Sequence, residues 1–247
     1  ARGPDVSQAF LQDARLRGIA FTGSGETARQ MQQELAKRTG PMVSFIAETS
    51  GLNAMIVDSS ALLETVVDDV VTSAFRSAGQ RCSSLRILAV QDEIADDLIK
   101  MLMGAMKDLR IGDPIHLSTD VGPVINLAAK KKLEHHIQTM QKNGGKVLYA
   151  CSLPEGLPQE AYMAPHLIAI KRYEDVQAEA FGPILHVLRY KRKDLDKLIG
   201  SINASNYGLT LGVHTRINTF AQYIRERAHV GNVYVNPFKL DPCPRAG

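Results

Sequence analysis

The chain has 247 residues, of which 45% are hydrophobic and 22% charged, and its formal net charge at pH 7 is +3. Such a composition is typical of a globular protein with one large domain or two small ones. No apolar run approaches the roughly 20 residues that span a bilayer. The basic residues are scattered, with short runs only at KKK (130–132) and RYKRK (189–193). Because nucleic-acid binding needs a concentrated basic patch, we interpret both runs as solvated ends of helices or strands.

The cysteines and histidines show no pattern typical of a disulfide framework or a metal site. The three cysteines, Cys82, Cys151 and Cys243, are an odd number without metal-ligand spacing, and the seven histidines form no HExxH-like motif. Such cysteine usage indicates a reducing compartment. The opening segment ARGPDVSQAF lacks the apolar core of a signal peptide. We therefore predict a cytoplasmic protein without a bound metal.

In chain order, short apolar strands alternate with segments of helical period. The first half predicts strands at 17–24, 42–48, 53–58 and 85–91, and helices at 26–38, 62–78 and 93–109. Ser59 or Ser60 is placed to cap the second of these helices, and Gly79 to end it.

The second half continues the alternation. It predicts helices at 128–145, 193–205 and 217–228, and strands at 146–150, 166–170, 182–190, 209–215 and 231–235. A surface loop is expected at CSLPEGLPQEAY (151–162). This order predicts an α/β fold with a mostly parallel sheet. Neither end matches a complete domain, because no strand precedes the first Gly-rich turn and three prolines fall in the last eleven residues. We interpret the chain as a fragment of a longer protein.

The stretch FTGSGE (21–26) sets a Gly-Ser-Gly turn between a strand and a helix. Backbone N–H groups and the positive helix end suit a phosphate there, and glycine lets a ligand approach closely. A tight strand-to-helix turn without a ligand explains the same residues.

In IAETSG (46–51), Glu48 directly follows an apolar strand. Partial desolvation would raise the pKa of this carboxyl and suit it to act as a general base. An exposed loop glutamate is the alternative.

In FRSAGQRCSSLR (75–86), Cys82 lies between a helix end and a strand. Arg81 and Arg86 would favour its thiolate, whereas the negative end of the preceding helix would oppose it. Cys82 is therefore either a nucleophile held in a turn or a small core residue.

The stretch EAFGPILHV (179–187) places Glu179 two residues before Phe181. A carboxylate can accept both hydrogen bonds of a sugar diol, and a phenyl ring can pack against a flat heterocycle. A loop glutamate beside a core phenylalanine is the alternative.

Together these stretches resemble the aldehyde dehydrogenase superfamily. The match runs through FTGSGE, ETSG, GQRC, GDP, GPVIN, EAFGP, YGLTLGVHT and GNVYVN, from about Arg17 to Asn236. The segments IAETSGLNAMIVDSSAL and SAGQRCSSLR are most similar to the glutamate-semialdehyde (1-pyrroline-5-carboxylate) dehydrogenase module of bifunctional bacterial proline utilization A proteins.

The resemblance implies a role for each matching residue. Cys82 would attack the aldehyde carbon, its own N–H would help to hold the oxyanion, and Glu48 would activate the water that hydrolyses the thioester. NAD would be the cofactor. The residues that would hold it are Thr22, Gly23, Ser24, Glu179 and Phe181. Arg81 and Ser83, which flank the nucleophile, would help to select an aldehyde that carries a carboxylate.

The resemblance also implies an organisation. Residues 1–50 would be the end of an NAD-binding domain, residues 51–236 the catalytic thiol domain of an aldehyde dehydrogenase-like three-layer fold, and residues 237–247 an irregular tail. The full-length protein would be a cytoplasmic bacterial homo-oligomer, with a possible proline dehydrogenase domain upstream and a membrane association through other domains.

Two departures from the family pattern stand out. Gly25 replaces the usual threonine, and Ser50 replaces a glycine whose backbone lies near the nucleophile. The family's oxyanion-hole asparagine and adenosine-ribose lysine precede these residues, so we expect this chain alone to turn over slowly. A non-catalytic fragment and a thiol-dependent esterase are the alternatives.

Overall fold

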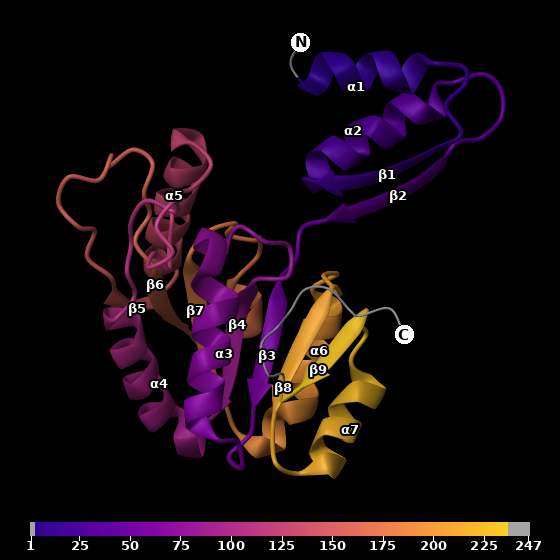
Figure 1. Cartoon of the computed structure of the whole chain (residues 1–247). Helices are drawn as coiled ribbons and strands as arrows, with labels where there is room; N and C mark the ends of the chain where they lie inside the picture. Colours follow the sequence, from indigo (N-terminus) through magenta and orange to yellow (C-terminus); the bar gives the residue numbers. More distant parts are fainter. Residues whose placement is uncertain (1–2, 237–247) are drawn as a thin grey trace. The chain divides into compact units, whose positions relative to one another are not determined.

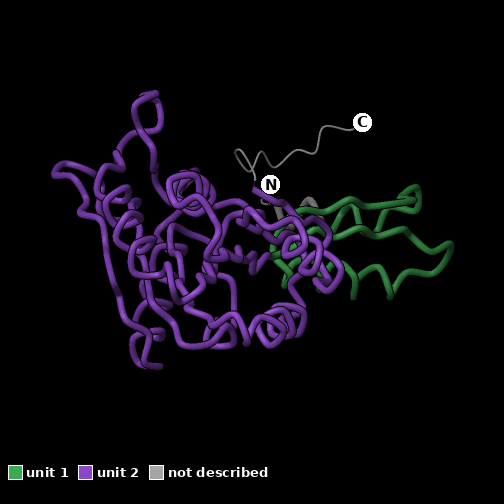
Figure 2. The backbone as a smooth tube through the Cα atoms, turned by 90° about the horizontal axis from the view of Figure 1, so that it is seen from below, with its two compact units in different colours: residues 1–50 green, residues 51–247 purple. Residues whose placement is uncertain are grey.

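The computed structural model describes residues 3–236, and the chain divides into two compact units, residues 1–50 and residues 51–247 (Figure 2). The first unit contains two helices and two strands: α1 (Gly3–Gln12), β1 (Gly18–Gly23), α2 (Gly25–Ala36) and β2 (Ser44–Thr49). β1 and β2 form a parallel pair in which Thr22 lies opposite Glu48. The helix α1 was not predicted, whereas β1, α2 and β2 lie within two residues of their predicted bounds.

The second unit is built on a seven-stranded sheet with the order β5-β6-β7-β4-β3-β8-β9. Its strands are β3 (Asn53–Val57), β4 (Leu85–Gln91), β5 (Lys146–Ala150), β6 (His166–Ile170), β7 (Ile184–Tyr190), β8 (Thr210–His214) and β9 (Asn232–Val235). β5 pairs antiparallel with β6, and the other neighbouring strands pair in parallel.

Helices cover both faces of this sheet, which confirms the predicted three-layer α/β fold. The helices of this unit are α3 (Leu63–Phe75), α4 (Asp92–Lys107), α5 (Leu127–Lys142), α6 (Leu195–Ala204) and α7 (Asn218–Arg227). α3 and α4 lie on one face and α6 lies on the other (Figure 1). β3 and β4 are buried along their whole length, as strands of a parallel sheet covered on both faces are. No helix in the described part of the chain is long and apolar enough to cross a membrane.

The start of α3 differs from the prediction. Its N-cap is Leu62, which makes no side-chain capping bond, so the cap predicted from Ser59 or Ser60 is wrong. Ser60 instead donates from its backbone N–H and its hydroxyl to the carboxylate of Asp58. The Ser60 hydroxyl oxygen accepts from the N–H of Arg216 (2.8 Å), so its acceptor is used there and not by the first N–H groups of α3.

The helix α3 also ends earlier than predicted. The α-helix stops at Phe75, and a 3₁₀ segment follows at Arg76–Gly79. Ser77 and Ala78 both have positive φ angles, 56° and 52°, which non-glycine residues rarely adopt. Such strain persists only where the surrounding structure fixes the backbone. The strained segment leads directly to the turn that carries Cys82.

We expect Gly79→Ala to lower the free energy of unfolding by at least about 2 kcal/mol. The φ angle of Gly79 is +65°, and an added Cβ would lie 2.2 Å from the carbonyl oxygen of Gly182. Gly104 in α4 is the matched control, because nothing lies within 4 Å of a Cβ there. Gly104→Ala should stabilise the helix by about 1 kcal/mol. Urea titrations followed by circular dichroism test both values, and a Gly79→Ala chain as stable as wild type would contradict the geometry.

A buried histidine pair joins α5 to the sheet. The Nε2 atoms of His136 and His186 lie 2.9 Å apart, and Nδ1 of His186 lies 2.9 Å from the carbonyl oxygen of Arg86. Because that carbonyl can only accept, His186 donates from Nδ1 and accepts at Nε2 from His136. Burial, and then the neighbouring His136, lower the pKa of His186 to about 3. Burial also lowers the pKa of His136.

This pair predicts a loss of stability in mild acid. The unfolded chain binds these protons near pH 6.5 and the folded chain only at lower pH, so unfolding becomes easier as the pH falls below about 6.5. Between pH 7 and pH 5 the pair should lower the free energy of unfolding by about 2 kcal/mol. Denaturant titrations at both pH values measure this loss. His186→Gln should reduce it, whereas His116→Gln, in an exposed loop, should not. If both variants lost equal stability between pH 7 and pH 5, this loss could not be assigned to the histidine pair.

Candidate active site

Cys82 lies in a turn at the amino-terminal edge of the large sheet, three residues before β4 begins. It is exposed, so the alternative of a buried core cysteine is wrong. The turn is closed by a hydrogen bond from the Ser84 N–H to the Arg81 carbonyl, 3.1 Å. In the described part of the chain no group accepts a hydrogen bond from the Cys82 N–H. That donor is therefore free to bind an oxyanion that forms beside the thiol.

Asn53, the first residue of β3, holds the Cys82 turn in place. Its buried Nδ2 donates to the carbonyl oxygens of Cys82 (2.7 Å) and Ser84 (2.9 Å), and its Oδ1 accepts from the N–H of Thr210 (3.2 Å). The side chain thus ties the turn to the starts of β3 and β8. Sequence reasoning assigned no role to Asn53. The signal available was an amide at the start of a strand that is otherwise apolar.

Gly51 packs directly against the same turn. A Cβ at this position would lie 2.4 Å from the carbonyl oxygen of Cys82 and 2.9 Å from Nδ2 of Asn53. No side chain fits there without moving the turn, so glycine is required for packing. The N–H of Gly51 donates to Oε2 of Glu179, 3.0 Å.

A buried ion pair connects the Cys82 turn to Glu179. The Arg86 side chain is fully buried, and its Nη2 lies 2.8 Å from Oε1 of Glu179, whose side chain is 8% exposed. Arg86 also donates to the carbonyl oxygens of Arg81 and Gly182. Burial lowers the pKa of Arg86, and the Glu179 carboxylate opposes that shift. Arg86 therefore has a structural role, and its predicted effect on the Cys82 thiolate stays a prediction.

Phe181 lies next to this ion pair, with the Arg86 guanidinium 5.5 Å from the centre of its ring. The ring is 45% exposed, so it does not belong to the core as one alternative held. Glu179 and Phe181 both precede β7 and therefore lie at the same edge of the sheet as Cys82.

Arg81 and Ser83, the residues on either side of Cys82, have different surroundings. Arg81 donates from Nη2 to the carbonyl oxygens of Thr72 (3.0 Å) and Ser73 (3.4 Å), where its charge stabilises the end of α3. Burial lowers the pKa of Arg81. Ser83 is partly buried in the turn itself.

Gln80 fixes the turn on its other side. Its Nε2 donates to the carbonyl oxygen of Pro123 (3.1 Å), and its Oε1 accepts from the N–H of Ile125 (2.8 Å). These two bonds attach the GPVIN loop to the segment that carries Cys82. Sequence reasoning did not find this clamp, because it joins residues more than 40 positions apart.

The other candidate residues lie in the first unit and meet at one end of its two strands. Thr22 lies opposite Glu48 in the β1–β2 pair, and Ser24 follows at the start of α2. The Ser24 hydroxyl accepts from the N–H of Thr27, 3.2 Å, which caps the helix. The Glu48 side chain is exposed, so the partial desolvation predicted for its carboxyl is wrong. The structure thus brings Thr22, Gly23, Ser24 and Glu48 together, and separately Arg81, Cys82, Ser83, Glu179 and Phe181.

No group of three or more His, Cys, Asp or Glu side chains that could hold a metal occurs among residues 3–236. Cys151 is partly buried beside the sheet, where its Sγ donates to the carbonyl oxygen of Met106 (3.2 Å). Burial raises the pKa of the Cys151 thiol to about 11. Cys151 is therefore a thiol at neutral pH and a poor nucleophile.

This fold and this thiol turn are those of a known class of protein. The family model described as "Aldehyde dehydrogenase family" matches residues 1–244. The chain belongs to the aldehyde dehydrogenase family.

Several relatives are more specific. The chain is 52% identical over 242 residues to "Bifunctional protein PutA" of Escherichia coli, covering 95% of this chain and 18% of that protein. It is 30% identical over 244 residues to "1-pyrroline-5-carboxylate dehydrogenase" of a Geobacillus species, covering 95% of this chain and 45% of that protein. The chain thus spans less than a fifth of the PutA protein that it resembles.

Solved structures agree with this grouping. A crystal structure of bifunctional proline utilization A (PutA) superposes with a TM-score of 0.89 at 47% identity, over 94% of this chain and 23% of that chain. The glyceraldehyde-3-phosphate dehydrogenase GapN of Methanocaldococcus jannaschii, complexed with NADP, superposes with a TM-score of 0.87 at 25% identity, over 99% of this chain and 52% of that chain.

Proposed function

We propose that these residues form the thiol-bearing part of an NAD-dependent dehydrogenase that oxidises glutamate γ-semialdehyde to glutamate. The observation that carries the proposal is the exposed Cys82 thiol in a turn whose carbonyl is held by Asn53 and whose own N–H has no acceptor in the described residues. A nucleophile beside an unpaired backbone donor suits the attack on a carbonyl carbon.

The reaction follows from the roles of the chain's own groups. The Cys82 thiolate attacks the aldehyde carbon, and the carbonyl oxygen becomes an oxyanion that accepts a hydrogen bond from the Cys82 N–H. After oxidation the carbon is a thioester. Glu48 takes a proton from water, the water oxygen forms the new C–O bond, and the C–S bond breaks to return the thiolate.

The residues present fit a dinucleotide cofactor. Ser24 caps α2 by accepting from the Thr27 N–H, and the first N–H groups of a helix have no intrahelical acceptor, which suits a pyrophosphate. Glu179 and the half-exposed Phe181 would hold the nicotinamide riboside. NAD⁺ supplies a two-electron hydride acceptor when it is bound. For Glu179 to accept a ribose diol, it would have to share its oxygens with Arg86 and Gly51.

The substrate proposal rests on similarity to PutA and to 1-pyrroline-5-carboxylate dehydrogenase. Arg81 and Ser83 flank Cys82 and would favour an aldehyde with a distal carboxylate, although Arg81 would have to bind it while its Nη2 donates to the end of α3. We also propose that the residues belong to a longer, cytoplasmic and oligomeric bifunctional protein that includes a proline dehydrogenase domain.

The test is NADH formation by the protein that carries these residues in their natural flanking sequence. We expect kcat/KM for glutamate γ-semialdehyde to exceed that for propanal by roughly 10²-fold, because propanal leaves the carboxylate-binding groups unpaired. Equal values would contradict the substrate assignment. Ester hydrolysis without any NADH formation would favour the thiol esterase, and neither activity would favour a non-catalytic fragment.

A further inference from the structure

The second unit contains a cavity that the proposed reaction does not use. Its volume is about 460 Å³, and the residues that line it are Asp92, Lys171, Arg172, Tyr173, Glu174, Leu188, Arg189, Tyr190, Lys191, Lys193, Asp194, Lys197, Leu198 and Ser201. It lies between the end of β7, the connection that follows β6, and the start of α6. The volume is within the range of sites that hold small molecules.

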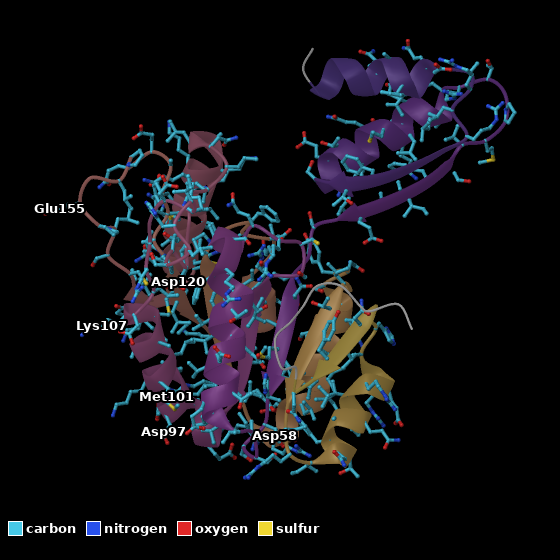
Figure 3. All side chains as sticks on the ribbon, in the orientation of Figure 1. Asp58, Asp97, Met101, Lys107, Asp120 and Glu155 are labelled. Atoms are coloured by element: carbon cyan, nitrogen blue, oxygen red, sulfur yellow. The ribbon has the colours of Figure 1, made fainter. Side chains whose placement is uncertain are left out.

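This cavity is at the opposite edge of the sheet from Cys82. Arg189 and Tyr190 end β7, whereas Glu179 and Phe181 precede that strand. Asp58, which follows β3, marks the same carboxyl-terminal edge at the lower end of the view in Figure 3. In open parallel sheets, ligands bind outside the carboxyl ends of the strands, and this is the edge where the cavity lies.

The lining is rich in basic side chains, and four of the six form no ion pair among residues 3–236. Arg189 pairs with Asp92 (3.7 Å) and with Asp96, and Arg172 pairs with Asp175 (3.1 Å). The four lysines, Lys171, Lys191, Lys193 and Lys197, form no ion pair within the described part of the chain. Of the other lining carboxylates, Glu174 accepts from the Ser201 hydroxyl. The unpaired lysines thus outnumber Glu174 and Asp194 by two.

The floor of the cavity is apolar. Leu188 and Leu198 are buried, and so are Tyr173 and Tyr190. The hydroxyl of Tyr173 donates to the carbonyl oxygen of Leu52 (2.9 Å), and that of Tyr190 to the carbonyl oxygen of Val57 (3.3 Å). Since both hydroxyls are bound elsewhere, the rings offer carbon surface to a ligand.

We propose that this cavity binds a small organic anion with two or more negative charges, a phosphate ester or a polycarboxylate with a compact carbon body. The lysines would hold the anionic groups, and the leucines and tyrosine rings would contact the carbon body. The RYKRK segment, which we interpreted from sequence as a solvated strand end, is one wall of this site. The site is separate from the aldehyde chemistry of Cys82.

Calorimetric titration of the full chain tests the proposal, with pyrophosphate as the phosphate probe and citrate as the carboxylate probe. We expect saturable binding of at least one probe. The triple variant Lys191→Gln/Lys193→Gln/Lys197→Gln should weaken it by about tenfold or more, because charge-assisted hydrogen bonds are lost. Glu174→Gln should tighten it by about threefold, because one opposing carboxylate is removed. Whichever probe binds more tightly identifies the anion class.

The matched control removes the same charge from α5, in Lys131→Gln/Lys132→Gln/Lys142→Gln, where all three lysines are exposed and outside the cavity. This variant should bind each probe within about twofold of wild type, with only the weak effect of distant, screened charges. Three results would each overturn the proposal: no saturable binding of either probe at millimolar concentration, unchanged binding by the cavity variant, or equal weakening by the control. The result is independent of NADH formation and of Cys82.

Discussion

Arg86→Met is expected to lower the free energy of unfolding of the second unit by about 3–5 kcal/mol, because it leaves the Glu179 carboxylate buried without its partner. Glu179→Gln should have a similar cost, since it leaves the fully buried Arg86 charge uncompensated. The double variant Arg86→Met/Glu179→Leu should recover a large part of this loss, because no buried charge remains. Urea titrations of the four proteins measure the coupling between the two residues.

Arg172→Met is the control for this pair. Arg172 and Asp175 also form an ion pair, but the Arg172 side chain is 71% exposed. Removing an exposed pair changes stability by less than about 1 kcal/mol. If the two arginine variants lost equal stability, the burial of the Arg86–Glu179 pair would not be what stabilises the Cys82 turn.

Cys82→Ala is expected to lower the rate of aldehyde-dependent NADH formation by at least about 10³-fold, since the reaction has no other nucleophile. The fold should be unaffected, because the side chain is exposed. The measurement compares steady-state rates of the wild-type and variant proteins in their natural flanking sequence, together with their melting curves.

Cys151→Ala is the matched cysteine control. Its thiol is partly buried with a raised pKa, so it should contribute to packing and not to the rate. We expect its rate to stay within about twofold of wild type, with a small loss of stability from the vacated volume. A large rate loss in Cys151→Ala, with Cys82→Ala still active, would exchange the roles assigned to the two residues.

The sequence predicted the strands of the large sheet well because their signals are local. β4 has the predicted bounds, Leu85–Gln91, and its apolar run is bounded by polar residues on both sides. Predictions from local sequence rules were wrong where contacts with other parts of the chain, or the backbone path, decided the structure. Ser60 does not cap α3 because its hydroxyl oxygen accepts from the Arg216 N–H, and α3 ends at Phe75 because the chain then turns through two left-handed residues.

The candidate site was only partly predictable for a different reason. Cys82 and Glu179 could be proposed from short motifs, whereas the groups that position them act over long sequence separations. Asn53 reaches the Cys82 carbonyl across 29 residues, and Arg86 reaches Glu179 across 93. Such contacts depend on which strands become neighbours in the sheet, and local composition does not contain that information.

The most direct test of the central claim is to locate the covalent intermediate by peptide mass spectrometry. The protein in its natural flanking sequence is mixed with NAD⁺ and glutamate γ-semialdehyde, quenched in acid within the first turnover and digested. We expect the mass of the glutamyl acyl group on the peptide that contains Cys82, and its absence when NAD⁺ is omitted. An acyl group on the Cys151 or Cys243 peptide, or turnover without any adduct on Cys82, would contradict the account.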